Sequence, residues 1–310
     1  MSTSSKERCE SDAMQRCASC GTAGGGDIEL KRCNACYLVR YCSVKCQKDH
    51  RPQHKKECKK RAAELQDEIL FKQPESCCFG DCPICCLPIP NDQTKSTLMG
   101  CCSKLICDGC NYANQKRERE QRLQNRCPFC RTAAPKTDEE INEQLMKRIE
   151  ANDPLTIRNM GRGRFHEGDY KGAFDYWTRA AALGDVPAHF QLSTLYHEGR
   201  GVEKDEKKEL HHLKKAAIGG HPGARHNLGR MELGKYRVDR AAKHWIIAAK
   251  LGNENSLNDL KNLYGSGFMS KDDFTAALRG YQAATAATKS PQREEAANRK
   301  AAGGSAPTRR

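Results

Sequence analysis

Fifteen cysteines and one histidine stand in two successive blocks of this 310-residue chain, at spacings typical of metal ligands. The first block offers eight ligands: Cys17, Cys20, Cys33, Cys36, Cys42, Cys46, His54 and Cys58. The second block offers eight more: Cys82, Cys85, Cys101, Cys102, Cys107, Cys110, Cys127 and Cys130. A two-residue gap lets both thiolates reach one tetrahedral zinc ion at about 2.3 Å, and each structural zinc takes four donors. The spacing therefore predicts four zinc ions, two in each block.

The competing interpretation is a disulfide scaffold in a secreted protein. Residues 1–7 hold no apolar stretch that could act as a signal peptide, and no run in the chain approaches the length of a membrane span. We therefore expect an intracellular, soluble, non-membrane protein of the cytoplasm or the nucleus, in which paired cysteines bind metal. Cys9, Cys77, Cys78 and Cys86 fall outside the sixteen ligands, and we interpret them as free or buried thiols.

The formal net charge of +14 suggests acidic partners or nucleic acid, but it counts every cysteine as neutral. Zinc-bound cysteines are thiolates, so seven thiolates and two dications leave the first block at −3, and eight thiolates leave the second at −4. The net charge then falls to about +7. The basic cluster from Arg117 to Arg122 is interrupted by Glu118 and Glu120, which favours solvated helix faces over a phosphate-binding stripe. We do not expect nucleic acid as a partner.

The segment Tyr41-Cys42-Ser43-Val44-Lys45-Cys46-Gln47, followed by His54 and Cys58, resembles the second half of a MYND zinc finger. The resemblance covers residues 17–58 and implies interleaved ligands, with Cys17, Cys20, Cys42 and Cys46 on one ion and Cys33, Cys36, His54 and Cys58 on the other. MYND fingers are protein-interaction modules, some of which bind proline-containing peptides. The family usually has a tryptophan where this chain has Arg51, so an acidic partner segment suits this position better.

Residues 82–131 resemble a RING finger, with Cys82-Pro83-Ile84-Cys85 at the start and Cys127-Pro128-Phe129-Cys130-Arg131 at the end. The resemblance implies one zinc on Cys82, Cys85, Cys107 and Cys110. The other site departs from the family, because Lys104 stands where a histidine is expected. Two completions remain open. Either Cys101 and Cys102 both join Cys127 and Cys130, with Gly100 allowing the turn, or one of them joins and the fourth ligand is water, Cys77, Cys78 or Cys86.

In RING fingers that act as ubiquitin ligases, the positions of Ile84, Pro128 and Arg131 contact the ubiquitin-conjugating enzyme or ubiquitin. The structural alternative is that Ile84 fills the small core and Pro128 shapes a turn. A ligase of this kind positions a charged partner enzyme and needs no nucleophile of its own. The sequence contains no catalytic triad, phosphate loop or carboxylate pair placed for chemistry.

The C-terminal half repeats. Large residues recur at intervals of 36, 32 and 36 (Trp177, Leu213, Trp245 and Tyr281), and alanines keep the same intervals (Ala180, Ala216, Ala248 and Ala284). A period of 32 to 36 with two helices per unit predicts an α-solenoid. The stretch from Tyr196 to Val202 resembles Sel-one-like repeats, relatives of tetratricopeptide repeats, and the resemblance covers about residues 151–284. It implies a concave surface that docks other proteins. We interpret His211, His212 and His221 as surface residues.

The predicted fold is a pair of small zinc-stabilised domains, MYND-like and RING-like, followed by an all-α solenoid of helical hairpin repeats. The expected domains are a disordered N-terminus (1–16), the MYND-like finger (17–58), a linker helix (59–76), the RING-like finger (77–135), the repeats (136–284) and a disordered basic tail (285–310). Two functions are the main alternatives. The chain is either a zinc-binding adaptor for proteins or peptide segments, or a RING-type ubiquitin ligase whose repeats select the substrate. A third, weaker alternative is a regulator of transcription that contacts nucleic acid through its basic helices.

Overall fold

The computed structural model describes residues 16–25 and 28–302, and the chain divides into two compact units, Met1–Lys72 and Gln73–Arg310. Except for Arg16, the N-terminus predicted to be disordered lies outside the described residues, as do residues 303–310 of the predicted tail. Across the residues that are described, we find no helix with both the length and the apolar character needed to cross a bilayer.

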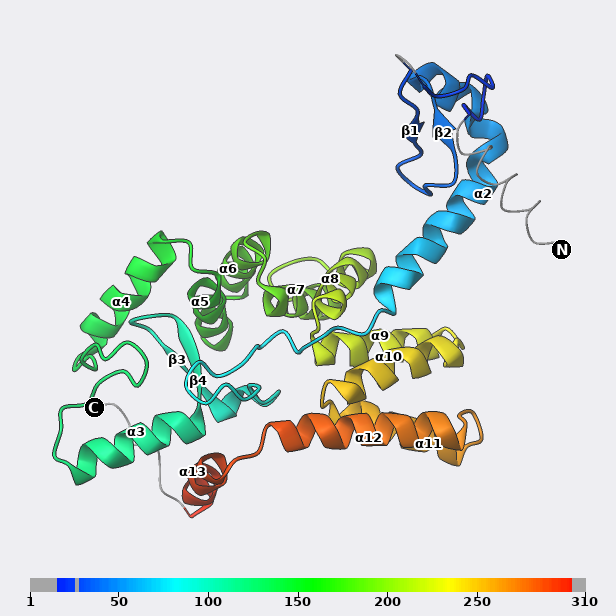
Figure 1. Ribbon diagram of the computed structural model, residues 1–310. Helices are drawn as coiled ribbons and strands as arrows, with labels where there is room; N and C mark the ends of the chain where they lie inside the picture. Colours follow the sequence, from blue (N-terminus) through cyan, green and yellow to red (C-terminus); the bar gives the residue numbers. More distant parts are fainter. Residues whose placement is uncertain (1–15, 26–27, 303–310) are drawn as a thin grey trace. The chain divides into compact units, whose positions relative to one another are not determined.

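The first unit is a short antiparallel strand pair followed by one long helix (Figure 1). Strand β1 (Lys31–Arg32) pairs with β2 (Arg40–Tyr41), and helix α2 runs over Val44–Leu70. The Ser43 side chain caps α2 by accepting a hydrogen bond from the Cys46 amide at 3.2 Å. Three predicted ligands, Cys46, His54 and Cys58, lie on this helix, which continues without a break into the predicted linker segment.

The second unit begins with the second cysteine block. A 3-10 turn η1 (Gln93–Lys95) leads into the antiparallel hairpin of β3 (Ser96–Met99) and β4 (Lys104–Cys107), and helix α3 (Asp108–Glu120) follows. The hairpin places Cys101 and Cys102 in its turn and Cys107 at the end of β4. Its core is small, with Ile89, Met99 and Ile106 packed among buried cysteines.

Helices form most of residues 138–302, and the predicted helical solenoid is confirmed. Helix α4 is followed by four helical hairpins and a final helix. We call the first helix of each hairpin its A-helix, and each A-helix begins 32 or 36 residues after the A-helix of the preceding hairpin. The bounds are α4 (Asp138–Glu150), α5 (Pro154–His166), α6 (Tyr170–Ala182), α7 (Val186–Glu198), α8 (Glu206–Ile218), α9 (Pro222–Gly234), α10 (Val238–Lys250), α11 (Glu254–Gly265), α12 (Lys271–Ala287) and α13 (Pro291–Ala301).

The repeating large and small residues form the solenoid core. Trp177, Leu213 and Trp245 are each no more than 2% exposed, and the matching alanines of these three helices are fully buried. The fourth member, Tyr281, is only half-buried. The A-helices approach the indoles closely, because a Cβ added to Gly161 would lie 2.6 Å from Trp177 and one added to Gly229 would lie 2.3 Å from Trp245.

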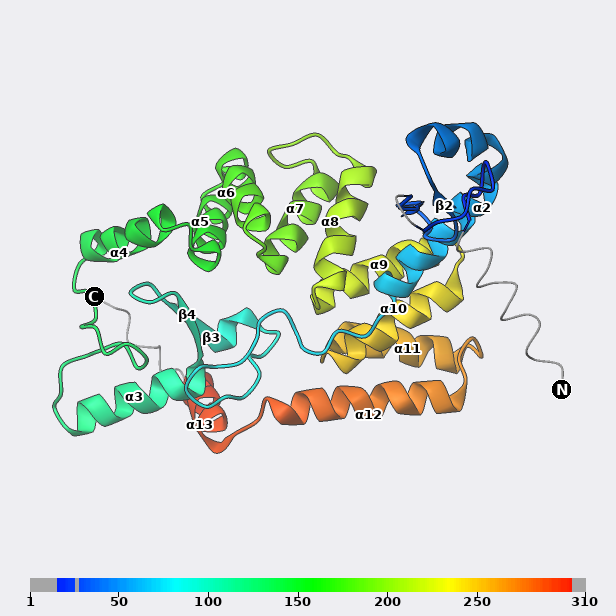
Figure 2. The same ribbon diagram turned by 45° about the horizontal axis from the view of Figure 1, so that its top comes forward.

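The second cysteine block packs against the inner side of the repeats (Figures 1 and 2). The Asn91 side chain donates to the Leu251 carbonyl at 2.8 Å, and the hydroxyls of Ser103 and Thr156 lie 2.6 Å apart. Arg148 of α4 donates to the Cys101 carbonyl. The second cysteine block and the solenoid therefore form one structural unit.

Two predictions are wrong. Residues 291–301, expected in a disordered basic tail, form α13, which packs against α3. Lys116 pairs with Glu295 at 2.8 Å, and Arg299 lies over the Tyr112 ring at 5.3 Å. His221, expected at the surface, is 7% exposed, because its Nδ1 caps α9 by accepting from the Ala224 amide at 3.1 Å.

Candidate metal centres

The structure brings all sixteen predicted ligands together in four groups of four. Within each group the ligand atoms lie within 4.8 Å of one another. The groups are Cys17, Cys20, Cys42 and Cys46; Cys33, Cys36, His54 and Cys58; Cys82, Cys85, Cys107 and Cys110; and Cys101, Cys102, Cys127 and Cys130. We refer to them as clusters 1 to 4.

The geometry of the clusters fits tetrahedral zinc. Four sulfurs at about 2.3 Å from a central ion lie about 3.8 Å from one another. The Sγ–Sγ distances are 3.5 Å for Cys20–Cys42, 3.7 Å for Cys33–Cys58 and 3.8 Å for Cys85–Cys107. Cysteine thiolates and imidazole are the donors that zinc prefers. The number, type and spacing of the donors therefore match this ion.

Cluster 2 contains the one histidine donor. Helix α2 places His54 on the face that looks toward the strands, where it is 5% exposed and its Nε2 lies 3.1 Å from Cys36 Sγ. The ring of His50 stacks on His54 with 5.7 Å between centroids, and its Nδ1 hydrogen-bonds the Tyr41 hydroxyl at 3.1 Å. His50 is therefore a packing neighbour of the cluster and not a member of it.

Cluster 4 groups the four cysteines of the first completion that the sequence left open. Cys101 lies 3.4 Å from Cys130, and Cys102 lies 3.8 Å from Cys127, so both adjacent cysteines face the same centre. The turn depends on Ser103, which has a left-handed φ of 53°, and not on Gly100 as expected from the sequence. Lys104 points elsewhere, with Nζ 5.8 Å from the Phe129 ring centroid.

One Cys-x2-Cys pair in each cluster shares a backbone turn that the sequence analysis missed. Four residues after the first cysteine, a left-handed residue donates its amide to the carbonyl of that cysteine at 2.9 to 3.0 Å. These residues are Gly21, Tyr37, Cys86 and Arg131, with φ between 55° and 75°. The turn directs both thiols to one side. Cys86, which the sequence offered as an alternative fourth ligand, forms this turn with its backbone, and its thiol belongs to none of the four clusters.

The thiols within a cluster compete for protons. Burial opposes ionisation of Cys17, but amides of Cys20, Cys42 and Ser19 outweigh it and lower its pKa to about 6. A hydrogen bond from Cys107 lowers the pKa of Cys82 to about 4. Burial, reinforced by the hydrogen bond with Cys33, raises the pKa of Cys58 to about 12. Such splitting is expected for neighbouring thiols that share protons, which a zinc dication would displace.

Comparison with known proteins accounts for two parts of the chain. Residues 17–58 match the MYND finger, and residues 159–185, 186–221 and 222–253 match the Sel1 repeat. The chain carries a MYND finger and Sel1 repeats. The MYND and Sel-one-like predictions are thereby confirmed, and with them zinc binding by the protein. The RING-type identity of residues 82–131 stays a prediction.

The similar curated proteins match short stretches of the chain. The SET domain and MYND-type zinc finger protein 6 of Schizosaccharomyces pombe is 39% identical over 59 residues, which are 19% of this chain and 12% of that protein. The histone-lysine N-methyltransferase SMYD3 of Homo sapiens is 53% identical over 34 residues, 11% of this chain and 8% of that protein. The chain thus spans about a tenth of the length of these relatives, and the activity in the second name is that protein's.

Solved structures with similarity to the chain include two Sel1-type proteins. A Sel1 repeat protein from Oxalobacter formigenes is 26% identical, with a TM-score of 0.43, over 58% of this chain and 72% of that one. A protective antigen of uropathogenic Escherichia coli with an SLR fold is 22% identical, with a TM-score of 0.38, over 63% of this chain and 40% of that one.

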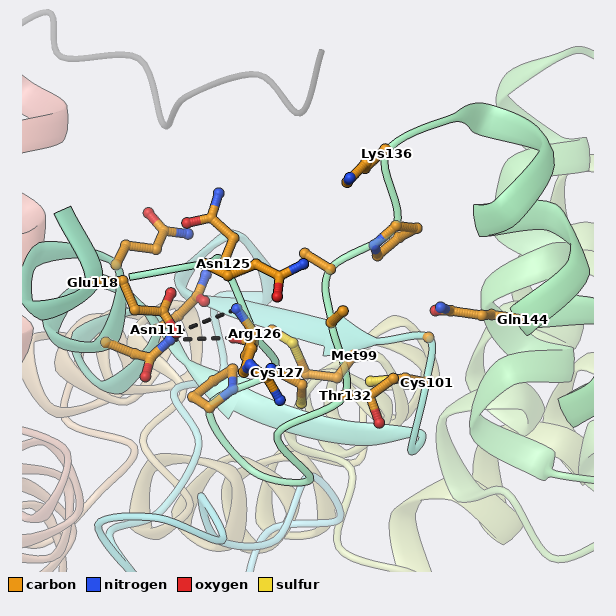
Figure 3. Close-up of a pocket in the computed structure, with 18 of the residues that line it drawn as sticks. Met99, Cys101, Asn111, Glu118, Asn125, Arg126, Cys127, Thr132, Lys136 and Gln144 are labelled. Atoms are coloured by element: carbon orange, nitrogen blue, oxygen red, sulfur yellow. Dashed lines mark hydrogen bonds between the residues drawn. The ribbon is translucent and has the colours of Figure 1, made fainter. Parts of the chain in front are cut away.

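The three residues predicted to contact a conjugating enzyme lie near the surface of the second block. Ile84 is 41% exposed, Pro128 is half-buried, and Arg131 is exposed, with its guanidinium donating to Asn114 at 3.1 Å. Beside cluster 4, a pocket of about 530 Å³ lies between α3, residues 124–136 and α4 (Figure 3). Its wall includes the buried Glu118, whose carboxylate accepts from the Arg126 amide at 3.2 Å.

Proposed function

We propose that this chain is a zinc-dependent scaffold that brings proteins together, with two zinc ions in each of its two cysteine blocks. The observation that carries the proposal is the presence of a MYND finger and Sel1 repeats in one chain with four complete donor sets. Sel1 repeat scaffolds generally bind proteins. The small core of the first finger supports a metal requirement, because three of its four buried hydrophobic residues are cysteines.

Metal analysis tests the zinc content. We expect four zinc ions per chain by elemental analysis and by native mass spectrometry. Cys20→Ser, Cys85→Ser and Cys130→Ser should each lower the content by one ion. Cys77→Ser is the matched control, because the Cys77 thiol donates to Asn91 at 3.3 Å and belongs to no cluster. Two ions in the wild type, or thiols oxidised in pairs, would contradict the proposal.

The MYND finger is the first candidate surface for a partner. Arg51 is exposed on α2, three residues before the ligand His54. A guanidinium at this position favours a carboxylate over the apolar contacts that tryptophan would make. We propose that the finger binds proline-containing segments that carry acidic residues.

Peptide titration tests this assignment. Acidic proline-containing peptides should bind the wild type, and their neutral amide counterparts should bind about tenfold more weakly. Arg51→Trp should reverse the preference, whereas Lys55→Trp, one turn further along the exposed face of α2, should leave it unchanged. Equal binding of acidic and neutral peptides by the wild type would refute the role of Arg51.

The second candidate function is a ubiquitin ligase. The matched families give it no support, and it stands on the exposure of Ile84 beside cluster 3. Ubiquitin chain formation with a panel of conjugating enzymes tests it. The comparison is between Ile84→Ala and Ile28→Ala, since both isoleucines are 41% exposed and only Ile84 lies in the second block. Chain formation by the wild type that Ile84→Ala alone abolishes would establish the ligase; no chains with any enzyme would exclude it.

A further inference from the structure

A second cavity of about 360 Å³ lies between the second cysteine block and the inner side of the repeats. We call it the inner cavity. Leu98 and Leu105 of the hairpin form one apolar wall, and Leu155, Phe190 and Trp177 of the repeats form the other. Its volume falls at the lower end of the range for cavities that hold small ligands or the end of a peptide.

The charged groups on the cavity wall are both cationic. Arg158 and Arg162 stand one turn apart on α5, and no carboxylate belongs to the described residues that line the cavity. Arg158 lies 3.6 Å from Asp185, which compensates its charge. Among the described residues Arg162 has no acidic partner, and its guanidinium donates to Asn159 at 2.7 Å. Partial burial and the Arg158 charge lower the pKa of Arg162, so an anion beside it would be stabilised.

Amide side chains complete the polar part of the wall. Gln93 Nε2 is buried and has no hydrogen-bond partner. A buried donor without a partner destabilises the folded state, so an acceptor in the cavity that bonds Gln93 would remove this penalty. Gln191 and Asn159 also face the cavity. His221 lines it as a neutral ring, since burial and the nearby Arg158 lower its pKa to about 3.

We propose that the inner cavity binds the C-terminal end of a partner protein that finishes in an apolar residue. The terminal carboxylate accepts from Arg162 and Gln93, and the last side chain packs between Leu98, Leu105 and Phe190. A free carboxylate supplies the negative charge that the wall lacks, and the apolar side chain matches the two walls. The inference rests on the proposed scaffold function and assigns a second partner site, separate from the MYND finger.

Calorimetric titration of the zinc-loaded full chain tests the proposal. The probes are tripeptides ending in leucine, phenylalanine or valine, each as the free acid and as the C-terminal amide. We expect the free acids to bind saturably and the amides to bind at least about tenfold more weakly. Arg162→Gln should weaken the free acids by the same factor and Arg162→Lys by less. Arg164→Gln, which removes a guanidinium paired with Glu167 at 3.3 Å, is the matched control and should bind like the wild type.

Four outcomes would overturn the proposal: no saturable binding of any free acid, equal binding of acids and amides, unchanged binding by Arg162→Gln, or tighter binding of hexanoate or inorganic phosphate than of every tripeptide. The test is separable from that of the MYND finger. Arg162→Gln should leave the binding of acidic proline-containing peptides intact, and Arg51→Trp should leave the tripeptides intact. Loss of both in either variant would overturn the assignment of two sites.

Discussion

Gly161 is the position where a single methyl group should test the packing of the repeats most directly. A Cβ there would lie 2.6 Å from both Cδ1 and Nε1 of Trp177, about 1 Å inside ordinary van der Waals contact. The indole ring of Trp177 has no open space into which it could move, because it is 2% exposed and its Nε1 donates to the Arg158 carbonyl at 3.1 Å. Gly161→Ala must therefore displace the indole or separate α5 from α6.

The magnitude follows from a matched substitution. Gly163 lies on the same helix, and a Cβ there would meet nothing within 4 Å. Both changes gain the helix propensity of alanine, about 1 kcal/mol, so this contribution cancels in the comparison. The remaining difference is the cost of overpacking, about 1–3 kcal/mol, with about 1 kcal/mol more where the indole hydrogen bond breaks. For a unit of this size the melting temperatures should differ by roughly 2–4 °C per kcal/mol.

Urea unfolding followed by circular dichroism at 222 nm measures the difference. We expect Gly163→Ala to raise the midpoint and Gly161→Ala to lower it. The second repeat suggests a rescue, since it has Ser193 and Leu213 at the corresponding positions, both buried. Trp177→Leu should therefore cost less in the presence of Gly161→Ala than alone. Equal midpoints for the two alanine variants, or strictly additive effects in the double variant, would refute the packing argument.

Four further outcomes are expected. Chelation of zinc should unfold the first finger, because its core is built from Cys17, Cys33, Cys36 and Tyr41, and a retained near-ultraviolet spectrum after metal removal would contradict this. Arg293→Ala should speed zinc release to a chromogenic chelator. The Arg293 guanidinium donates to the Leu87 and Pro88 carbonyls at 3.1 and 2.7 Å and lies 3.5 Å from Cys85 Sγ. The control is Arg299→Ala on the same helix, which should release zinc like the wild type. Cys86→Gly should keep the full zinc content and raise the melting temperature slightly, because glycine suits its φ of 55°, and loss of an ion would show Cys86 to be a ligand. His221→Asn should reduce acid sensitivity. Burial lowers the folded-state pKa of His221 from 6.5 to about 3, so the contribution of the neutral ring to stability is present above pH 6.5 and is lost as the pH falls toward 3. The loss is on the order of 5 kcal/mol in all, and parallel pH–stability curves for variant and wild type would refute the argument.

The sequence was sufficient where local spacing determines structure. Two-residue gaps between cysteines specify the turns in which an amide bonds the carbonyl of the first cysteine. The intervals of 36 and 32 residues specify which side chains stack in the repeats. The adjacent pair Cys101 and Cys102 was ambiguous, because the direction of two neighbouring thiols depends on the φ of Ser103, which no composition rule predicts. His221 could have been placed correctly by aligning the A-helix caps, where Asp153, Asp185 and Asn253 occupy the same position.

The C-terminal helix could not have been predicted from local pattern. Ala296 is its only residue classed as buried among those described, so α13 has no apolar stripe to reveal it. Its position depends on polar contacts with residues about 200 positions earlier, including Arg293 with Pro88 and Lys300 with the Thr94 carbonyl at 3.0 Å. Contacts of this kind leave no periodicity in the sequence, because the acceptors are backbone carbonyls, which every residue has.

The packing of the second block against the repeats changes what the Sel1 segment can do. Family resemblance implies a concave surface open to partners, yet here two residues of the second block occupy part of that surface. Phe79 packs edge-on against the His221 ring at 5.6 Å between centroids, and the Asn91 side chain donates to the Leu251 carbonyl. The hairpin that carries cluster 4 also touches the first repeat through Ser103. Much of the inner side is therefore covered within the chain, and the inner cavity is the partner site that we propose there. Since cysteines form most of the small core of this block, zinc bound there would hold one wall of that cavity in place, so metal loading and tripeptide binding should rise and fall together.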